Sequence, residues 1–244
     1  MTKPQSENFS ENELANISYS GQQATAAATS ALSASGGKKF LLGENYRKEW
    51  QQKIEGVPVF DLATEHGGLK IVKRGGGMQT KSLRLAAEDG KQYVLRSIEK
   101  FPEKAVPAAL RGTVAADVVE DQISGSHPYG AFVIPKLASA AGVYHANPKL
   151  VYLPDDHRLG IYREDFGDGL YLYEERADDD YWEDYENFGA PRDIISTADV
   201  IEETRKDNDD IIDYSHVLKS RLFDMWIGDW DRHEDQWRWA EYKG

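Results

Sequence analysis

The chain has 244 residues, with 29 lysines and arginines, 42 aspartates and glutamates and no cysteine, and its formal net charge is −13. An acidic chain lacks the basic face that neutralises phosphates, which excludes a general duplex-binding protein, and we expect no nucleic-acid partner. The absence of cysteine excludes disulfides and thiolate metal sites. No apolar run reaches the ~18–20 residues that span a bilayer. We therefore expect this chain by itself to behave as a soluble protein.

Composition divides the chain into three parts. Residues 1–38 are rich in serine, alanine and glycine, with too little apolar surface to offset the entropy of ordering, which predicts a disordered or linker segment. Residues 39–176 are predicted to form a sheet-rich lobe with a helix and a hinge, and residues 177–244 a partial helical lobe. Charge also divides the chain, since residues 1–150 carry +3 and residues 151–244 carry −16. A solvated acidic surface explains this split, and so does a phosphate-plus-metal cleft between two lobes.

The predicted elements begin with three strands that form a meander, over 69–73, 80–85 and 92–98, with Gly75, Gly76 and Gly77 in the first turn. Hydrophobic periodicity then predicts helices over 107–123 and 131–141, strands over 150–153, 159–162 and 170–174, and helices over 197–206 and 214–227. The last helix is predicted to be amphipathic from the spacing of Val217, Leu218, Arg221, Leu222, Met225 and Trp226. Strands, a helix, more strands and then helices are typical of an α+β fold.

The densest group of polar side chains follows the last helix, in the sequence GDWDRHEDQW at residues 228–237. Buried charges need partners, so this segment is either a helix cap, with Arg232 pairing to nearby carboxylates, or a functional loop. In an extended loop, alternate side chains point to one side. Such side chains would form a set of oxygen and nitrogen ligands suited to Mn²⁺ or Mg²⁺, which would support metal-assisted hydrolysis. The set consists of Asp229, Asp231, His233 and Asp235.

The same segment resembles the D-R-H-x-x-N loop of atypical kinases, which include phosphoinositide, secretory-pathway and CotH-type kinases. The resemblance implies that Asp231 is the catalytic residue that accepts the proton of a substrate hydroxyl, with Arg232 and His233 bracing the loop. It also implies Mg²⁺ and ATP as cofactors. Gln236 falls where those kinases carry a metal-binding asparagine, and its side chain is one methylene longer, which puts the metal geometry in doubt.

Two upstream features fit this interpretation. The backbone N–H groups of the triglycine turn can approach an anion closely, although a loose hairpin turn would show the same residues. Arg96 lies where kinases carry a lysine on a strand, and it would give a bidentate phosphate contact, although it could equally be an exposed strand residue. Its acidic partner is predicted on the following helix. The predicted nucleotide-binding residues are thus Gly75, Gly76, Gly77, Arg96, Glu120 and Asp121.

The tripeptide Asp165-Phe166-Gly167 has the letters of the metal-binding kinase motif, but it precedes Asp231, whereas in kinases it follows the catalytic loop. We therefore interpret it as a turn that leads into the strand at 170–174. That strand, followed by Glu175 and Arg176, has the order expected of a hinge between two lobes.

On a larger scale, the segments FDLATEHGGLKIVKRGGGMQTKSLRL, YVLRSIEK, DQISGSHPYGAFVIPKLASAAGV and GDWDRHEDQW resemble a bacterial region best known from Bacteroidetes-type proteins. In those proteins it follows a calcineurin-like metallophosphoesterase domain and precedes a surface-antigen β-barrel. The resemblance implies a protein-kinase-like two-lobe fold truncated at its C-terminus, from a periplasmic or outer-membrane-associated parent that meets the membrane only through the barrel.

Two functions follow as hypotheses. The first is a kinase-like fragment, inactive alone, that ancestrally binds a magnesium nucleotide and transfers a phosphoryl group to an acceptor that the sequence does not identify. The second is a non-catalytic connector with the same fold between a phosphoesterase domain and a barrel.

Overall fold

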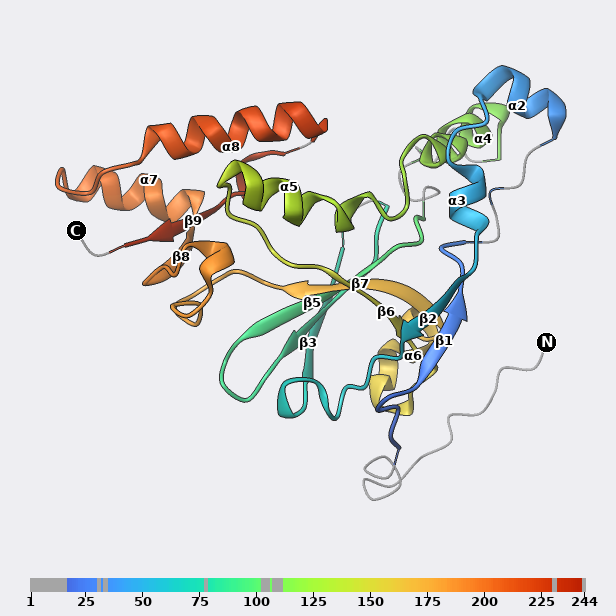
Figure 1. Ribbon diagram of the computed structural model, residues 1–244, viewed down its shortest axis with the longest axis horizontal. Coiled ribbons are helices and arrows are strands. Elements are labelled where there is room, and N and C mark those ends of the chain that lie inside the picture. Colours follow the sequence, from blue (N-terminus) through green and yellow to red (C-terminus); the bar gives the residue numbers. More distant parts are fainter. Residues whose placement is uncertain are drawn as a thin grey trace. The chain divides into compact units, whose positions relative to one another are not determined.

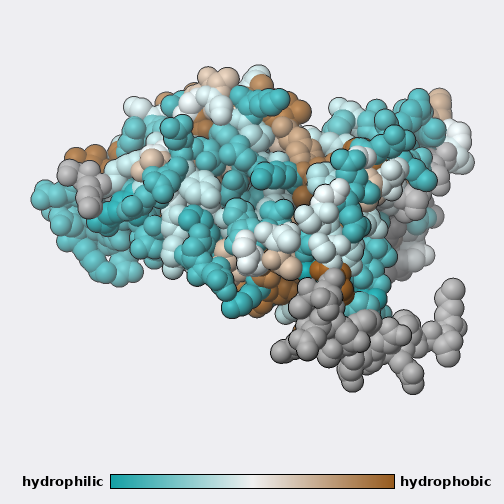
Figure 2. Space-filling model, turned by 60° about the horizontal axis from the view of Figure 1, so that its bottom comes forward, coloured by the Kyte–Doolittle hydropathy of each residue, from teal (hydrophilic) through white to brown (hydrophobic). Residues whose placement is uncertain are grey.

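The protein is an α+β protein whose helices and sheets lie in two compact units (Figure 1). The computed structural model describes residues 17–29, 32, 35–76, 79–101, 106, 112–229 and 232–242, without the side chains of Val114, Ala115 and Glu120. Unit 1 comprises Met1–Asp89, Val94–Pro128 and Leu150–Tyr173, and unit 2 comprises Gly90–Tyr93, Tyr129–Lys149 and Glu174–Gly244. Each unit is described by itself. Much of the surface in Figure 2 is hydrophilic, in keeping with the acidic composition.

Unit 1 holds most of a five-stranded sheet with the strand order β3-β4-β5-β7-β6. Its strands are β3 (Lys70–Gly75), β4 (Ser82–Ala86), β5 (Gln92–Ser97), β6 (Lys149–Leu153) and β7 (Gly169–Glu175). β3 and β4 are antiparallel, and their register runs from Lys70 opposite Ala86 to Gly75 opposite Ser82. Leucines on three of the strands are completely buried, namely Leu83, Leu85, Leu95 and Leu153. The strands predicted at 69–73, 80–85, 92–98, 150–153 and 170–174 are all confirmed.

The amino-terminal part of unit 1 differs from the sequence-based expectation. Within the segment predicted as a linker, 1–38, the strand β1 (Gln23–Ala26) pairs with β2 (Ile54–Pro58), and α2 (Gly36–Leu42) begins. The backbone N–H of Thr29 donates to the carbonyl of Trp50 at the end of α3 (Arg47–Gln51), and Ala28 is buried. A polar sequence is therefore ordered here because a distant strand satisfies its backbone groups, which composition does not reveal. Residues 1–16 lie outside the described residues.

The remaining helices of unit 1 are short. They are η1 (Glu65–Gly67), α4 (Val114–Asp121), η4 (Gln122–Gly125), η6 (His157–Tyr162) and α6 (Arg163–Phe166). The strand predicted at 159–162 is wrong, because this segment is the 3₁₀ helix η6. The Asp156 side chain accepts from the backbone N–H of Arg158 and starts the helix, and Gly160, with φ 54°, interrupts it. Side-chain capping of this kind competes with strand formation.

Unit 2 is built from helices around a two-stranded sheet. Its elements are η5 (Gly130–Phe132), α5 (Ile134–Ala141), η7 (Glu186–Phe188), β8 (Asp193–Ser196), α7 (Thr197–Lys206), α8 (Tyr214–Ile227), η8 (Glu234–Gln236) and β9 (Arg238–Glu241). β8 and β9 are antiparallel, and Trp182, Phe188 and Ile194 form a core cluster. The helices predicted at 197–206 and 214–227 have the observed bounds. Ser196 caps α7 in a reciprocal pair with Asp199, and Asp213 caps α8.

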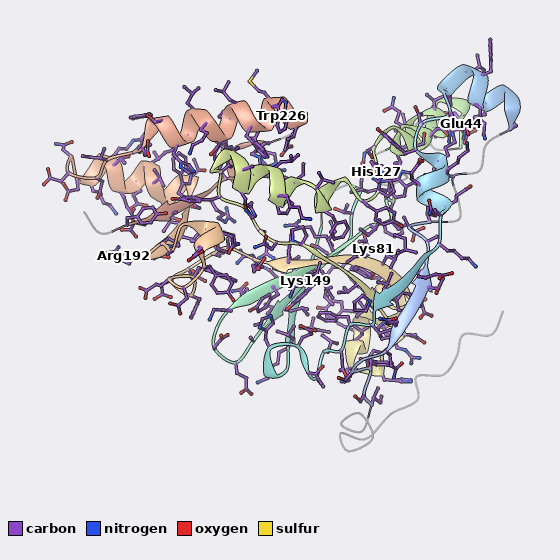
Figure 3. The ribbon with its side chains drawn as sticks, in the orientation of Figure 1. Glu44, Lys81, His127, Lys149, Arg192 and Trp226 are labelled. Carbon is purple, nitrogen blue, oxygen red and sulfur yellow. The ribbon has the colours of Figure 1, made fainter. Side chains whose placement is uncertain are left out.

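The apolar stripe predicted on α8 is present but largely exposed. Leu218, Leu222, Met225 and Trp226 are 60%, 55%, 72% and 69% exposed, and Trp226 lies near the carboxyl end of the helix (Figure 3). The helix instead buries Phe223 and the carboxylate of Asp224. Periodicity identified the helix correctly but not the face that it buries.

Candidate functional site

The glycine turn joins β3 to β4, the first two strands of the five-stranded sheet. Gly76 has φ 108°, and a Cβ atom there would lie 2.3 Å from the carbonyl oxygen of Thr80 and 3.0 Å from the backbone nitrogen of Ser82. A Cβ on Gly75 would lie 2.8 Å from the Ser82 hydroxyl. Any other residue would therefore strain the chain at Gly76. Gly77 lies outside the described residues.

The base of this turn carries an ion-pair cluster that the sequence analysis did not single out. Arg74, at the end of β3, donates to Asp165 of α6 over 2.5 Å, and the ammonium of Lys81, just before β4, donates to the backbone carbonyl of Asp165 over 3.1 Å. Phe166 also belongs to α6, which closes at Gly167. Asp165 and Phe166 thus end α6, and the predicted turn follows at Gly167 and Asp168 and leads into β7. Asp165 contacts residues 91 and 84 positions earlier.

Arg96 is exposed on β5, the third strand of the sheet. Asp121, at the end of α4, is buried, and both of its oxygens are taken by cations. Arg47 of α3 forms a bidentate pair with it, and the ammonium of Lys38 lies 2.9 Å from Oδ1. The hydrogen bonds from Arg47 hold the pKa of Asp121 below its ordinary value, although burial opposes them.

This geometry gives Asp121 two cationic partners, and its assignment to a nucleotide site stays a prediction. A carboxylate held by two cations of α2 and α3 anchors those helices to α4, and the buried pair gives it a structural role. The other predicted partner of Arg96 is Glu120, whose side chain lies outside the described part of the chain. The pairing between Arg96 and the helix therefore stays a prediction.

In unit 2, the polar loop after α8 is held together by Arg232. The helix ends at Gly228, with φ 77°, and the backbone N–H of Asp229 then donates to the carbonyl of Asp224. Nη2 of Arg232 donates to Asp229 over 2.7 Å, and Nε lies 3.1 Å from Oδ1 of buried Asp224. Burial raises the pKa of Asp224, and Arg232 opposes this effect. Arg232 thus pairs with two carboxylates and braces the start of the loop.

Aromatic and polar contacts continue this bracing. The guanidinium groups of Arg221 and Arg232 lie 5.8 and 6.0 Å from the centre of the Trp237 ring, a distance at which cations are attracted to the ring face. The Thr197 hydroxyl donates to the carbonyl of Glu234 and accepts from the indole N–H of Trp239. These contacts tie the loop to α7.

The other predicted residues of the loop are solvent-facing. His233 is exposed, and its Nδ1 lies 3.8 Å from a carboxylate oxygen of Asp235. Gln236 is exposed at the end of η8. Asp231, the predicted catalytic residue, lies outside the described residues. Among the residues that the structure does describe, no three His, Asp or Glu side chains are grouped to hold a metal ion, so the metal roles of Gln236 and of Asp229, Asp231, His233 and Asp235 stay predictions.

Comparison with known proteins assigns no family or function to this chain. Comparisons with protein-family models, curated proteins and solved structures give no match. Within the described residues, no helix combines the length and apolar character needed to cross a membrane. The candidate residues also divide between the units, with the glycine turn, Arg96 and Asp121 in unit 1 and the loop after α8 in unit 2.

Proposed function

We propose that the chain is a kinase-like domain that binds a magnesium nucleotide and directs phosphoryl transfer to a hydroxyl acceptor. One observation carries the proposal. A glycine turn joins the first two strands of a five-stranded sheet, the third strand carries the exposed cation Arg96, and the acidic helix α4 follows. Protein kinases use this order, with a glycine-rich loop over the phosphates, a cation on the third strand and an acid on the next helix.

The residues at the turn fit a polyphosphate. Gly75 and Gly76 have no side chains to shield the backbone, and at Gly76 a Cβ atom would clash with the carbonyl oxygen of Thr80. Backbone N–H groups in such a turn can bind anions. The guanidinium of Arg96 would add a bidentate contact. When bound, the magnesium nucleotide would supply the phosphoryl group, and the protein would position it.

The resemblance gives the loop in unit 2 its own predicted roles. Asp231 would orient an acceptor hydroxyl and take its proton, while Arg232 holds the loop through Asp224 and Asp229. Gln236 is the residue of this loop that the resemblance assigns to Mg²⁺. By the resemblance, the domain would belong to an envelope-associated parent protein.

A non-catalytic connector is the second candidate function. The exposed apolar stripe on α8 favours it, because apolar surface of this kind marks interaction sites. The pairing of Asp121 with Arg47 and Lys38 also favours the connector, because a carboxylate held in this way is less available to a nucleotide site.

Nucleotide binding to the Arg96→Gln variant tests the proposal. Mg-ATP at 100 times its dissociation constant should stabilise the wild-type protein by about 2.7 kcal/mol, which thermal unfolding detects. Arg96→Gln should weaken binding about tenfold or more, because a charge-assisted hydrogen bond contributes about 1.5–3 kcal/mol. Lys70→Gln is the matched control, since Lys70 is also exposed but lies at the far end of β3. An unchanged melting temperature of the wild-type protein would reject nucleotide binding and favour the connector.

A further inference from the structure

Two cations flank the glycine turn. Arg74 is the residue before Gly75 on β3, and Lys81 is the residue before Ser82 on β4, so the two lie on opposite sides of the same hairpin base. Both reach one residue of α6. Arg74 pairs with Asp165 over 2.5 Å, and Lys81 donates to the backbone carbonyl of Asp165 over 3.1 Å, with its ammonium 3.9 Å from the carboxylate.

Aromatic rings hold both cations in place. The Lys81 ammonium lies 4.0 Å from the centre of the Phe101 ring, and the Arg74 guanidinium lies 5.9 Å from that of Phe166. The Lys81 side chain is only 17% exposed. Two preorganised cations thus face one carboxylate beside a glycine-rich turn, and these three side chains together carry a net positive charge.

The carboxylate is the weakly held member of this group. Asp165 and Arg74 are 43% and 39% exposed, and exposed ion pairs contribute little to stability because solvent screens them. A polyphosphate carries several negative charges and matches the planar fork of an arginine. Such an anion can therefore take the place of the Asp165 carboxylate, while the backbone contact between Lys81 and Asp165 remains.

We infer that Arg74 and Lys81 form a polyphosphate-binding pair at the glycine turn, and that Asp165 occupies this pair and competes with the ligand. The choice of ATP as the natural ligand rests on the proposed function, whereas the competition at the pair does not. ATP and inorganic tripolyphosphate share the recognised chemistry, and separate titrations distinguish them.

The Asp165→Asn variant tests the competition, with Asp155→Asn as its matched control. Asp155 pairs with Arg163 in the same unit, is 48% exposed, and loses the same charge when changed to asparagine. Tripolyphosphate and Mg-ATP are titrated into each full-length variant by calorimetry at 0.15 M ionic strength, a salt level that screens distant charges. We expect Asp165→Asn to bind tripolyphosphate about twofold to fivefold more tightly than Asp155→Asn. Adding Arg74→Gln or Lys81→Gln to Asp165→Asn should remove this gain.

The outcomes separate the two proposals. If Asp165→Asn binds tripolyphosphate no more tightly than Asp155→Asn, or if neither binds it, the inference is overturned. If tripolyphosphate shows the gain but Mg-ATP does not bind to any variant, the inference stands and the proposed function fails. If Mg-ATP binds but Asp165→Asn shows no gain in affinity for tripolyphosphate, the inference is overturned and the proposed function stands. Circular dichroism and melting temperatures of each variant show that it is folded.

Discussion

Arg47 and Asp121 form a buried ion pair within unit 1. Both side chains are almost completely buried, and they join elements 74 residues apart in the sequence. Removing Arg47 leaves buried Asp121 with only the partly exposed Lys38 as a cationic partner, and breaking a buried pair costs more than the pair contributes when intact. Arg47→Ala should therefore destabilise the protein by about 3–5 kcal/mol in urea unfolding.

Lys39→Ala is the control for this prediction. Lys39 pairs with Glu44 on the surface, and the loss of an exposed pair costs about 0–1 kcal/mol. Adding Asp121→Asn to Arg47→Ala should recover part of the lost stability, because it removes a buried charge that only Lys38 still pairs. Equal destabilisation by Arg47→Ala and Lys39→Ala would show that the pair is not buried in solution.

Single residues also show how far the sequence predicts the site. The resemblance implied that Arg232 braces the loop, and Arg232 does pair with Asp229 and Asp224 there. Asp121 was expected to serve a nucleotide, and Asp165 was expected in a turn. The contacts that these two residues make were missed, because their cationic partners lie 74 and 91 residues earlier in the sequence. Local spacing cannot report such contacts, since they depend on how distant elements meet.

The positions of most helices and strands were predicted better than their tertiary contacts and buried faces. The three-strand meander and the helices α7 and α8 follow from period and turn residues, and they occur with nearly the expected bounds. β1 and η6 were missed, since the first depends on pairing with a distant strand and the second on the side-chain cap of Asp156. The buried face of α8 could not be predicted, because apolar residues lie on both of its faces.

α8 gives a direct test of which face is buried, since Leu222 and Phe223 are sequence neighbours that point about 100° apart around the helix. Phe223 is 7% exposed and Leu222 is 55% exposed. Phe223→Ala should cost about 3–5 kcal/mol through the cavity that it leaves. Leu222→Gln, which keeps helix propensity, should change stability by about 0.5 kcal/mol or less, as surface substitutions do.

Urea unfolding at two protein concentrations measures both variants. A large loss of stability in Leu222→Gln that grows with protein concentration would show that the stripe is covered by another molecule in solution. A large loss that does not depend on concentration would contradict the exposed placement of Leu222.

For the whole molecule, buried carboxylates of the two units differ in the direction of their pKa shifts. In unit 1, hydrogen bonds from Arg47 lower the pKa of Asp121. In unit 2, burial raises the pKa of Asp224. An unfolded aspartate has a pKa of about 3.9. Asp121 therefore contributes stability above about pH 3.9, which is lost as the pH falls through its lower folded pKa.

Asp224 acts in the opposite direction. Its folded pKa lies above the unfolded value, so its ionised form costs stability at neutral pH, and this cost disappears as the pH falls through the folded pKa towards about 3.9. Mild acid should therefore stabilise the surroundings of α8 before stronger acid weakens the contact between α3 and α4.

Hydrogen exchange followed by mass spectrometry, corrected for the intrinsic effect of pH on exchange, measures this order. As the pH falls from neutral towards about 3.9, amide protection in α8 should rise, while α3 and α4 keep theirs until the pH falls below about 3.9. Asp224→Asn should remove the rise in α8 and leave the response of α3 and α4 unchanged. Loss of protection in α3 and α4 while the pH is still above about 3.9 would contradict the lowered pKa of Asp121, because its carboxylate should then keep its charge.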